Sequence, residues 1–167
     1  AQLPGGQRVL THGGAGGVGS VPVQLAHHAR AHVIATVSAA NAALVKTLGA
    51  DEVIDYRSTS FETVVRHIDV VFDTVGGETR ARSWNVLRKG GRLVTVAADA
   101  ERFNEPRVRE AFFIVEPNRT QLIEMSRLMD AGALKPVVGS IFPMERFREA
   151  YEQKPAHGKN VLQIAHR

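Results

Sequence analysis

The residues His12–Gly19 read His-Gly-Gly-Ala-Gly-Gly-Val-Gly and directly follow the apolar run Arg8–Thr11. Within them Gly14, Gly16 and Gly19 have the G-x-G-x-x-G spacing, and an apolar-periodic segment follows, which predicts a strand, a tight glycine turn and a helix. In such a turn Gly14 permits a bend that a Cβ would strain, Gly16 lets the backbone approach a pyrophosphate, and Gly19 allows close packing of the helix on the sheet. Unpaired N–H groups at the helix N-terminus would then face the anion. The alternative is a tight strand-to-helix connection without a ligand.

Composition sets broad limits. The 167 residues are one domain's worth of chain, and 44% hydrophobic with 23% charged residues is ordinary for a globular protein. The absence of cysteine excludes disulfides, thiolate zinc sites and cysteine nucleophiles. No apolar run has membrane-spanning length, and the first residues lack the basic and apolar regions of a signal peptide. We therefore expect a cytoplasmic protein without a membrane partner.

Charge distribution is more informative than net charge. The net charge is +4, but the basic residues are scattered and aromatic residues are few, which argues against a nucleic-acid partner. Residues 1–50 contain no Asp or Glu, whereas Arg8, Arg30 and Lys46 are basic. The half of the chain that holds the glycine turn therefore favours an anionic ligand, and a phosphate-rich cofactor is the simplest candidate.

Short β-branched runs alternate with helical patterns along the chain, which indicates an α/β fold with a parallel sheet. Strands are predicted at 8–11, 32–37, 52–56, 68–73, 92–97 and, as a sixth, Ala111–Val115. The stretch Asp99–Glu110 is interpreted as a loop, and the remainder as a helix at 118–131, an extended segment at 137–142, a helix at 144–152 and a closing strand at 160–165. The prediction is a Rossmann fold: a doubly wound, parallel, six-stranded sheet with helices on both faces. Pro22 predicts a kink in the first helix, or a start later than the glycine turn implies.

The end of the second strand bears on the choice of cofactor. NAD-binding domains of this kind have an acid about 20 residues after the glycines that holds the ribose 2′-hydroxyl, but here the first acid is Asp51. Small polar groups at Ser38 and Asn41 could bond a 2′-phosphate, which favours NADP over NAD. Charge or a hydroxyl could come from Lys46, Tyr56 or Arg57. The alternative is that Ser38 and Asn41 only cap the next helix.

Six stretches match one known family in order along nearly the whole chain. They are Gly13–Gly19, Val23–Ala26, Leu48–Asp51, Val53–Tyr56, Asp73–Gly77 and Gly158–Leu162. With these stretches the chain resembles the cofactor-binding domain of the medium-chain dehydrogenase/reductase superfamily, in its zinc-independent quinone-oxidoreductase (zeta-crystallin-like) branch. The resemblance implies an NADPH-dependent reductase of quinones, enones or related activated carbonyl compounds. It also implies an N-terminal GroES-like catalytic domain, which is absent from residues 1–167 and would carry most substrate-positioning groups.

The resemblance also implies a set of cofactor-binding residues. The pyrophosphate would lie on Gly14, Ala15, Gly16, Gly17, Val18 and Gly19, and the 2′-phosphate would lie by Ser38 and Asn41 with Tyr56 nearby. The nicotinamide end would be flanked by Val75, Gly76, Ala97, Phe113 and Val115. Lys154 or Lys159 could reach a phosphate. A homodimer would form where the edge strands 111–115 of two subunits join.

Other chemistry finds little support in the sequence. The seven histidines show no metal-ligand spacing, so no metal site is predicted. Asp73 is expected at the carboxyl end of its strand, facing the ligand crevice, and Asp69 at the far end, so they do not form a catalytic pair. No general acid is assigned. Two other functions stay open: a non-catalytic NADPH-binding or sensing module, and an S-adenosylmethionine methyltransferase, although that class wants an acid after the second strand.

Overall fold

The computed structural model describes residues 3–102 and 105–164. Its main sheet has five parallel strands in the order β3-β2-β1-β4-β5. They are β1 (Arg8–His12), β2 (His32–Val37), β3 (Glu52–Asp55), β4 (Ile68–Asp73) and β5 (Leu87–Thr95). Because the order reverses between β1 and β4, the carboxyl ends of these two strands flank the crevice in which such sheets bind ligands.

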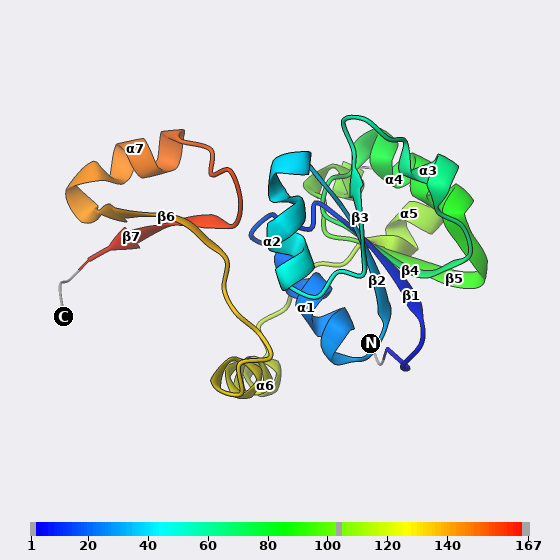
Figure 1. The fold of residues 1–167 in the computed structure, drawn as a ribbon, viewed down its shortest axis with the longest axis horizontal. Coiled ribbons are helices and arrows are strands. Elements are labelled where there is room, and N and C mark those ends of the chain that lie inside the picture. The colour runs from blue at the N-terminus through cyan, green and yellow to red at the C-terminus, as the bar shows by residue number, and fades with distance from the viewer. Residues whose placement is uncertain (1–2, 103–104, 165–167) are drawn as a thin grey trace.

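Helices cover both faces of this sheet, as predicted (Figure 1). Helices α1 (Ser20–His28) and α2 (Ala42–Thr47) lie on one side, and α3 (Phe61–Val64), α4 (Gly77–Ser83) and α5 (Pro106–Ala111) on the other. Successive strand residues point to opposite faces. Val9 and Val33 therefore pack with α1 and α2, while Leu10 and Ile34 belong to the core on the other side. The four residues are almost completely buried, as in a sheet covered twice.

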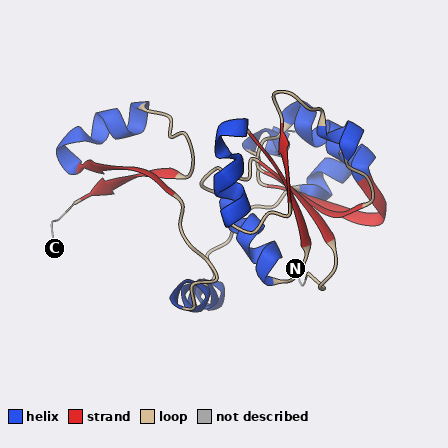
Figure 2. Cartoon of the chain, in the orientation of Figure 1, coloured by secondary structure: helices blue, strands red, loops and turns tan. Residues whose placement is uncertain are grey.

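The C-terminal part forms a second, smaller unit beside the main sheet (Figure 2). Helix α6 (Arg119–Asp130) leads into two parallel strands, β6 (Val138–Pro143) and β7 (Lys159–Gln163), which are connected through α7 (Phe147–Glu152). Asn118 begins α6, since its Oδ1 accepts the Gln121 N–H (3.0 Å). Short 3₁₀ helices lie at Ala39–Asn41, Trp84–Val86, Ala98–Arg102 and Met144–Arg146. Residue 165 of the predicted closing strand lies outside the described residues.

The predicted sixth strand, Ala111–Val115, is wrong. Pro106 opens α5 at its first turn, where a missing N–H costs nothing, so part of the predicted loop Asp99–Glu110 is helical. The helix extends to Ala111, and beyond it only Phe112 pairs, in an isolated bridge with Thr95. The main sheet thus has five strands and ends at β5.

Pro22 is accommodated by a late helix start, one of the two predicted outcomes. Helix α1 begins at Ser20, which puts Pro22 in its first turn, where a backbone N–H has no partner within the helix. Val18 therefore precedes the helix and is 47% exposed instead of packing on the sheet. Among the described residues, no helix has the length and apolar character needed to cross a membrane.

Candidate functional site

The glycine turn joins β1 to α1 at the point where the strand order reverses. The Gly16 N–H donates to the Gly13 carbonyl (2.9 Å), and the Gly14 N–H donates to the Thr36 carbonyl of β2 (3.2 Å). A Cβ at Gly19 would overlap the Gly13 carbonyl, so the start of α1 rests directly on the turn. These contacts hold the turn beside the crevice outside the carboxyl ends of β1 and β4.

The segment Ala156–Lys159, here named the crossing segment, runs over the glycine turn from the other end of the chain. The Gly158 N–H donates to the Ala15 carbonyl (2.8 Å), and Gly158 pairs with Gly16 as in a parallel sheet. Gly158 has a φ of +59°, and a Cβ there would overlap the carbonyl of Val137. Only glycine fits this position without strain.

Lys159 of the crossing segment lies on the glycine turn. A Cβ at Gly17 would overlap the side-chain carbons of Lys159, so the lysine stem rests on the bare Gly17 backbone. Its ammonium group has no carboxylate or hydrogen-bond partner in the described part of the chain. Lys154, the other lysine considered from the sequence, is not among the nearest neighbours of the described glycines of the turn. The structure thus brings a positive charge to the turn from β7.

Ser38 and Asn41 meet at the carboxyl end of β2. The Asn41 side-chain amide donates to the Ser38 hydroxyl (3.3 Å) and to the Ala156 carbonyl of the crossing segment (3.0 Å). Neither side chain caps the following helical turns, so the capping alternative is wrong. Both polar groups therefore lie between the second strand and the crossing segment.

The other residues considered for a 2′-phosphate are divided between the two ends of the sheet. Tyr56 follows β3, is 58% exposed, and has the Arg57 guanidinium 5.8 Å from its ring centroid. Lys46 instead donates to the carbonyl of Asp51, just before β3, so it lies at the opposite end of the sheet. Asp55 also lies at this end of the sheet, which the sequence did not predict. Asp55 pairs in register with the last residue of β2, and its Oδ1 accepts the Arg57 N–H (3.1 Å).

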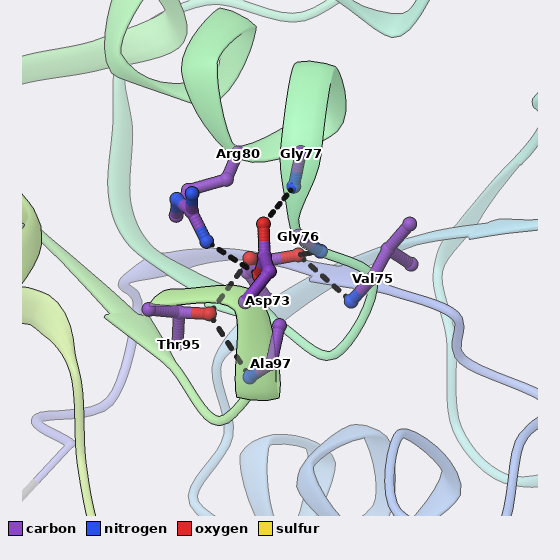
Figure 3. Close-up of polar contacts among 8 residues, drawn as sticks. Asp73, Val75, Gly76, Gly77, Arg80, Thr95 and Ala97 are labelled. Atoms are coloured by element: carbon purple, nitrogen blue, oxygen red, sulfur yellow. Dashed lines mark hydrogen bonds and ion pairs between the residues drawn. The ribbon is translucent and has the colours of Figure 1, made fainter. Parts of the chain in front are cut away.

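The turn after β4 is built around Asp73, whose carboxylate is fully buried (Figure 3). Its Oδ1 accepts the N–H groups of Val75 (2.9 Å) and Gly76 (3.0 Å), and its Oδ2 accepts the Thr95 hydroxyl (2.8 Å). The Thr95 oxygen in turn accepts the Ala97 N–H (3.2 Å). Asp73 lies at the carboxyl end of its strand, as predicted, but its carboxylate does not face the crevice. Instead, the carboxylate accepts hydrogen bonds from the turn after β4 and from Thr95 at the end of β5.

A second carboxylate, that of Asp99, holds the same turn from the other side. It accepts the Gly77 N–H (2.9 Å) and pairs with the almost completely buried Arg80 (2.8 Å). Partial burial acts to raise the pKa of Asp99, but the Arg80 guanidinium and the Gly77 N–H hold it below its usual value. Gly76 has a φ of +81°, and a Cβ there would overlap the Asp99 carboxylate. No sequence pattern pointed to Asp99 or Arg80.

Three segments are expected at the nicotinamide end, namely the turn after β4, the turn after β5 and Phe113–Val115. In the structure they lie together. The Thr74 hydroxyl donates to the His12 carbonyl (2.8 Å), which ties the turn after β4 to the end of β1. The Phe113 N–H donates to the Thr95 carbonyl (3.0 Å), so Phe113–Val115 starts beside the end of β5. Val75 is 55% exposed beside these groups and so presents an apolar side chain to solvent.

His12, the last residue of β1, lies fully buried beneath the glycine turn. Its Nδ1 is 3.0 Å from the Thr36 hydroxyl and its Nε2 is 2.9 Å from the Ser83 hydroxyl. Ser83 donates to the Thr79 carbonyl, so it accepts from Nε2, and Thr36 donates to Nδ1. Burial lowers the pKa of His12 to about 4, with smaller effects from Asp73, Arg82 and Glu62. The imidazole is neutral and has both nitrogens satisfied, which suits a structural role.

The described residues also form a groove of about 570 Å³ in the C-terminal unit. It shares no residue with the site predicted from the sequence. It is lined by Phe147, Arg148, Ala150, Tyr151, Glu152, Asn160 and Leu162.

Comparison with known proteins identifies the family of the chain. A model of the family described as zinc-binding dehydrogenase matches residues 48–162. The chain is 34% identical over 168 residues to the chloroplastic NADPH-dependent alkenal/one oxidoreductase of Arabidopsis thaliana. The aligned region covers 96% of this chain and 42% of that protein. The chain spans about half the length of the curated relatives it matches.

Solved structures agree. The quinone oxidoreductase of Coxiella burnetii superposes with a TM-score of 0.85 at 29% identity, over 99% of this chain and 55% of that one. The mycobacterial protein Rv1454c, solved with NADPH, superposes with a TM-score of 0.78 at 28% identity, over 97% and 58% of the two chains. The chain therefore belongs to the zinc-binding dehydrogenase family, as a Rossmann-type cofactor-binding domain of the medium-chain dehydrogenase/reductase superfamily related to quinone and alkenal/one oxidoreductases.

Proposed function

We propose that this chain binds NADPH, as the cofactor-binding domain of an oxidoreductase that reduces quinones, enones or related activated carbonyl compounds. One observation carries the choice of NADPH. The carboxyl end of β2 offers Ser38 and Asn41 where an NAD-binding domain has an acid, and the crossing segment adds the Lys159 ammonium beside the glycine turn. A 2′-phosphate and a pyrophosphate both fit such a surface.

The described residues suggest which part of the chain would bind each part of the cofactor. The bare backbone of the glycine turn, just before α1, would bind the pyrophosphate, because peptide N–H groups and the helix dipole favour an anion. Val75, Gly76 and Ala97 would lie against the nicotinamide end, held by Asp73. When bound, NADPH supplies a hydride to the acceptor, and the protein's contribution is orientation and electrostatics. No general acid is assigned to this chain.

The family's name refers to zinc, and the residues of this chain do not fit that ion. The sequence has no cysteine, and the described residues contain no group of three or more His, Asp or Glu side chains that could hold a metal. The proposed chemistry therefore assigns zinc no step in this chain.

Several expectations about the whole protein stay predictions. Because the relatives are about twice as long, the proposal includes a separate GroES-like catalytic domain that supplies substrate-positioning groups. A homodimer through 111–115 would have to use the exposed extended segment Phe113–Val115 beside β5, because this stretch is not itself a strand. A cytoplasmic location also stays a prediction, since the Arabidopsis relative is chloroplastic.

The proposal is tested by calorimetric titration of the chain with NADPH and, separately, with NADH. We expect clear preference for NADPH. Preference for NADH would contradict the assignment of the 2′-phosphate site while keeping a dinucleotide fold. Binding of neither cofactor would contradict the proposed function.

Replacing Ser38 by aspartate is expected to weaken NADPH binding by at least about tenfold and to leave NADH binding unchanged or stronger. A carboxylate at the end of β2 would repel a 2′-phosphate and could bond a ribose hydroxyl instead. Ser38→Asn is the matched control, since asparagine has nearly the same size as aspartate but carries no charge. Equal affinities of the two variants for NADPH would place the 2′-phosphate elsewhere.

Replacing Lys159 by methionine is expected to weaken NADPH binding about five- to tenfold and to reduce its dependence on salt. Methionine keeps an unbranched stem on Gly17 and removes only the ammonium, which would otherwise bond a phosphate with charge assistance. Lys154→Met removes a lysine five residues earlier and should change neither property. The assignment of Lys159 to the cofactor would be lost if both variants bound NADPH like the unaltered chain.

A further inference from the structure

The buried carboxylate of Asp73 needs a reason beyond the fold of the sheet. Asp73 ends β4, and its side chain is fully buried. Burying a carboxylate is costly unless hydrogen bonds compensate it. The donors that compensate it are the N–H groups of Val75 and Gly76 and the hydroxyl of Thr95. The two N–H groups belong to the turn after β4 and not to a strand ladder.

Asp73 also acts on the next strand, β5, through the Thr95 hydroxyl. The Thr95 oxygen accepts the Ala97 N–H, so its own hydrogen is directed to Asp73. One carboxylate therefore sets the backbone of the turn after β4 and, through Thr95, that of the turn after β5 (Figure 3). The two turns are neighbours because β4 and β5 pair in register up to Asp73 and Thr95.

The turn after β4 has little freedom to move away from this arrangement. Asp99 accepts the Gly77 N–H on the opposite side, and its carboxylate packs against Gly76. Gly76 has a φ of +81°, which a residue with a side chain adopts rarely. Val75 is left as the exposed apolar side chain of a turn whose backbone is held from both sides.

We infer that Asp73 is a positioning residue, which acts through Val75, Gly76 and the Thr95–Ala97 relay to fix the surface that receives the nicotinamide end of the cofactor. The inference rests on the proposed function. The groups that donate to Asp73 lie in the turn after β4 and in β5, and they are separate from Ser38, Asn41 and Lys159, which would hold the other end of the cofactor. Its effect should therefore be confined to the nicotinamide half.

The test compares two ligands on the full chain. NADPH carries the nicotinamide, whereas adenosine 2′,5′-bisphosphate carries only the adenosine half with its 2′-phosphate. For Asp73→Asn, which keeps the shape and removes the charge, we expect the affinity for NADPH to fall about tenfold, and that for the bisphosphate to stay within about twofold of the unaltered chain.

A matched pair at Thr95 keeps the inference testable if Asp73→Asn does not fold. Thr95→Val removes the hydroxyl at nearly constant shape and should lower NADPH affinity selectively, by about threefold to tenfold. Thr95→Ser keeps the hydroxyl and should bind NADPH like the unaltered chain. Equal loss for both ligands, or no loss for NADPH, would overturn the inference. Failure of the unaltered chain to bind NADPH would instead overturn the proposed function, and the inference with it.

Discussion

Replacing Gly19 by alanine is expected to lower NADPH affinity at least about thirtyfold and the free energy of unfolding by about 2 kcal/mol. The backbone of Gly19 has φ −61° and ψ −26°, which alanine adopts without strain. The added Cβ, however, would overlap the Gly13 carbonyl, and this carbonyl also accepts the Gly16 N–H. Since the Gly13 carbonyl belongs to the backbone and a Cβ has no rotamer, no side-chain rotation relieves the contact, and the turn itself must shift. Calorimetric titration and urea unfolding of the variant measure the two effects.

Gly132→Ala is the matched control for this prediction. Gly132 has a φ of +71°, so alanine there is strained, but a Cβ would meet no atom within 4 Å. We expect a loss of about 1 kcal/mol in the free energy of unfolding with unchanged NADPH affinity. Wild-type affinity in Gly19→Ala would show that the turn tolerates displacement and is not the pyrophosphate site.

The five strands of the main sheet could be predicted because each contains a short apolar or β-branched run, and in β1 and β2 this run is buried almost throughout. Residues 111–115 are also apolar, but an apolar run of this length does not distinguish a strand from the end of a helix and an extended tail. Here Pro106 opens α5, and the helix uses Ala111 as a buried residue. The same composition therefore led to a wrong sixth strand.

The candidate site was predictable where it depends on local geometry. Glycine spacing located the turn, and the end of β2 located Ser38 and Asn41. Contacts between distant segments left no such signal. Nothing in the spacing placed Gly158 on Ala15, and Asp73 could be assigned to a strand end without its orientation being known. The direction of a side chain at a strand end depends on which backbone donors the neighbouring turns present, and this is decided only in the folded chain.

Between about pH 6.5 and 4 the protein is expected to lose roughly 3 kcal/mol of its free energy of unfolding through His12 alone. Burial lowers the pKa of His12 from 6.5 to about 4, so the unfolded chain binds the proton in this window and the folded chain does not. The stabilisation is complete above pH 6.5, diminishes as the pH falls, and is lost below about pH 4. Urea unfolding at intervals across this range measures it.

Two variants separate titration of His12 from packing around it. His12→Gln cannot take up the proton, so it should be less stable at pH 7 but show a flatter dependence of stability on pH between 6.5 and 4. Thr36→Val removes the hydroxyl that donates to Nδ1, so it should lower stability by about 1–2 kcal/mol while keeping the slope. Carboxylates such as Asp69 and Asp99, whose pKa values are lowered, lose their contribution at the acid end of the range in all three proteins. The difference in slope therefore belongs to His12, and equal slopes in His12→Gln and the unaltered chain would mean that the buried imidazole takes up its proton without disturbing the fold.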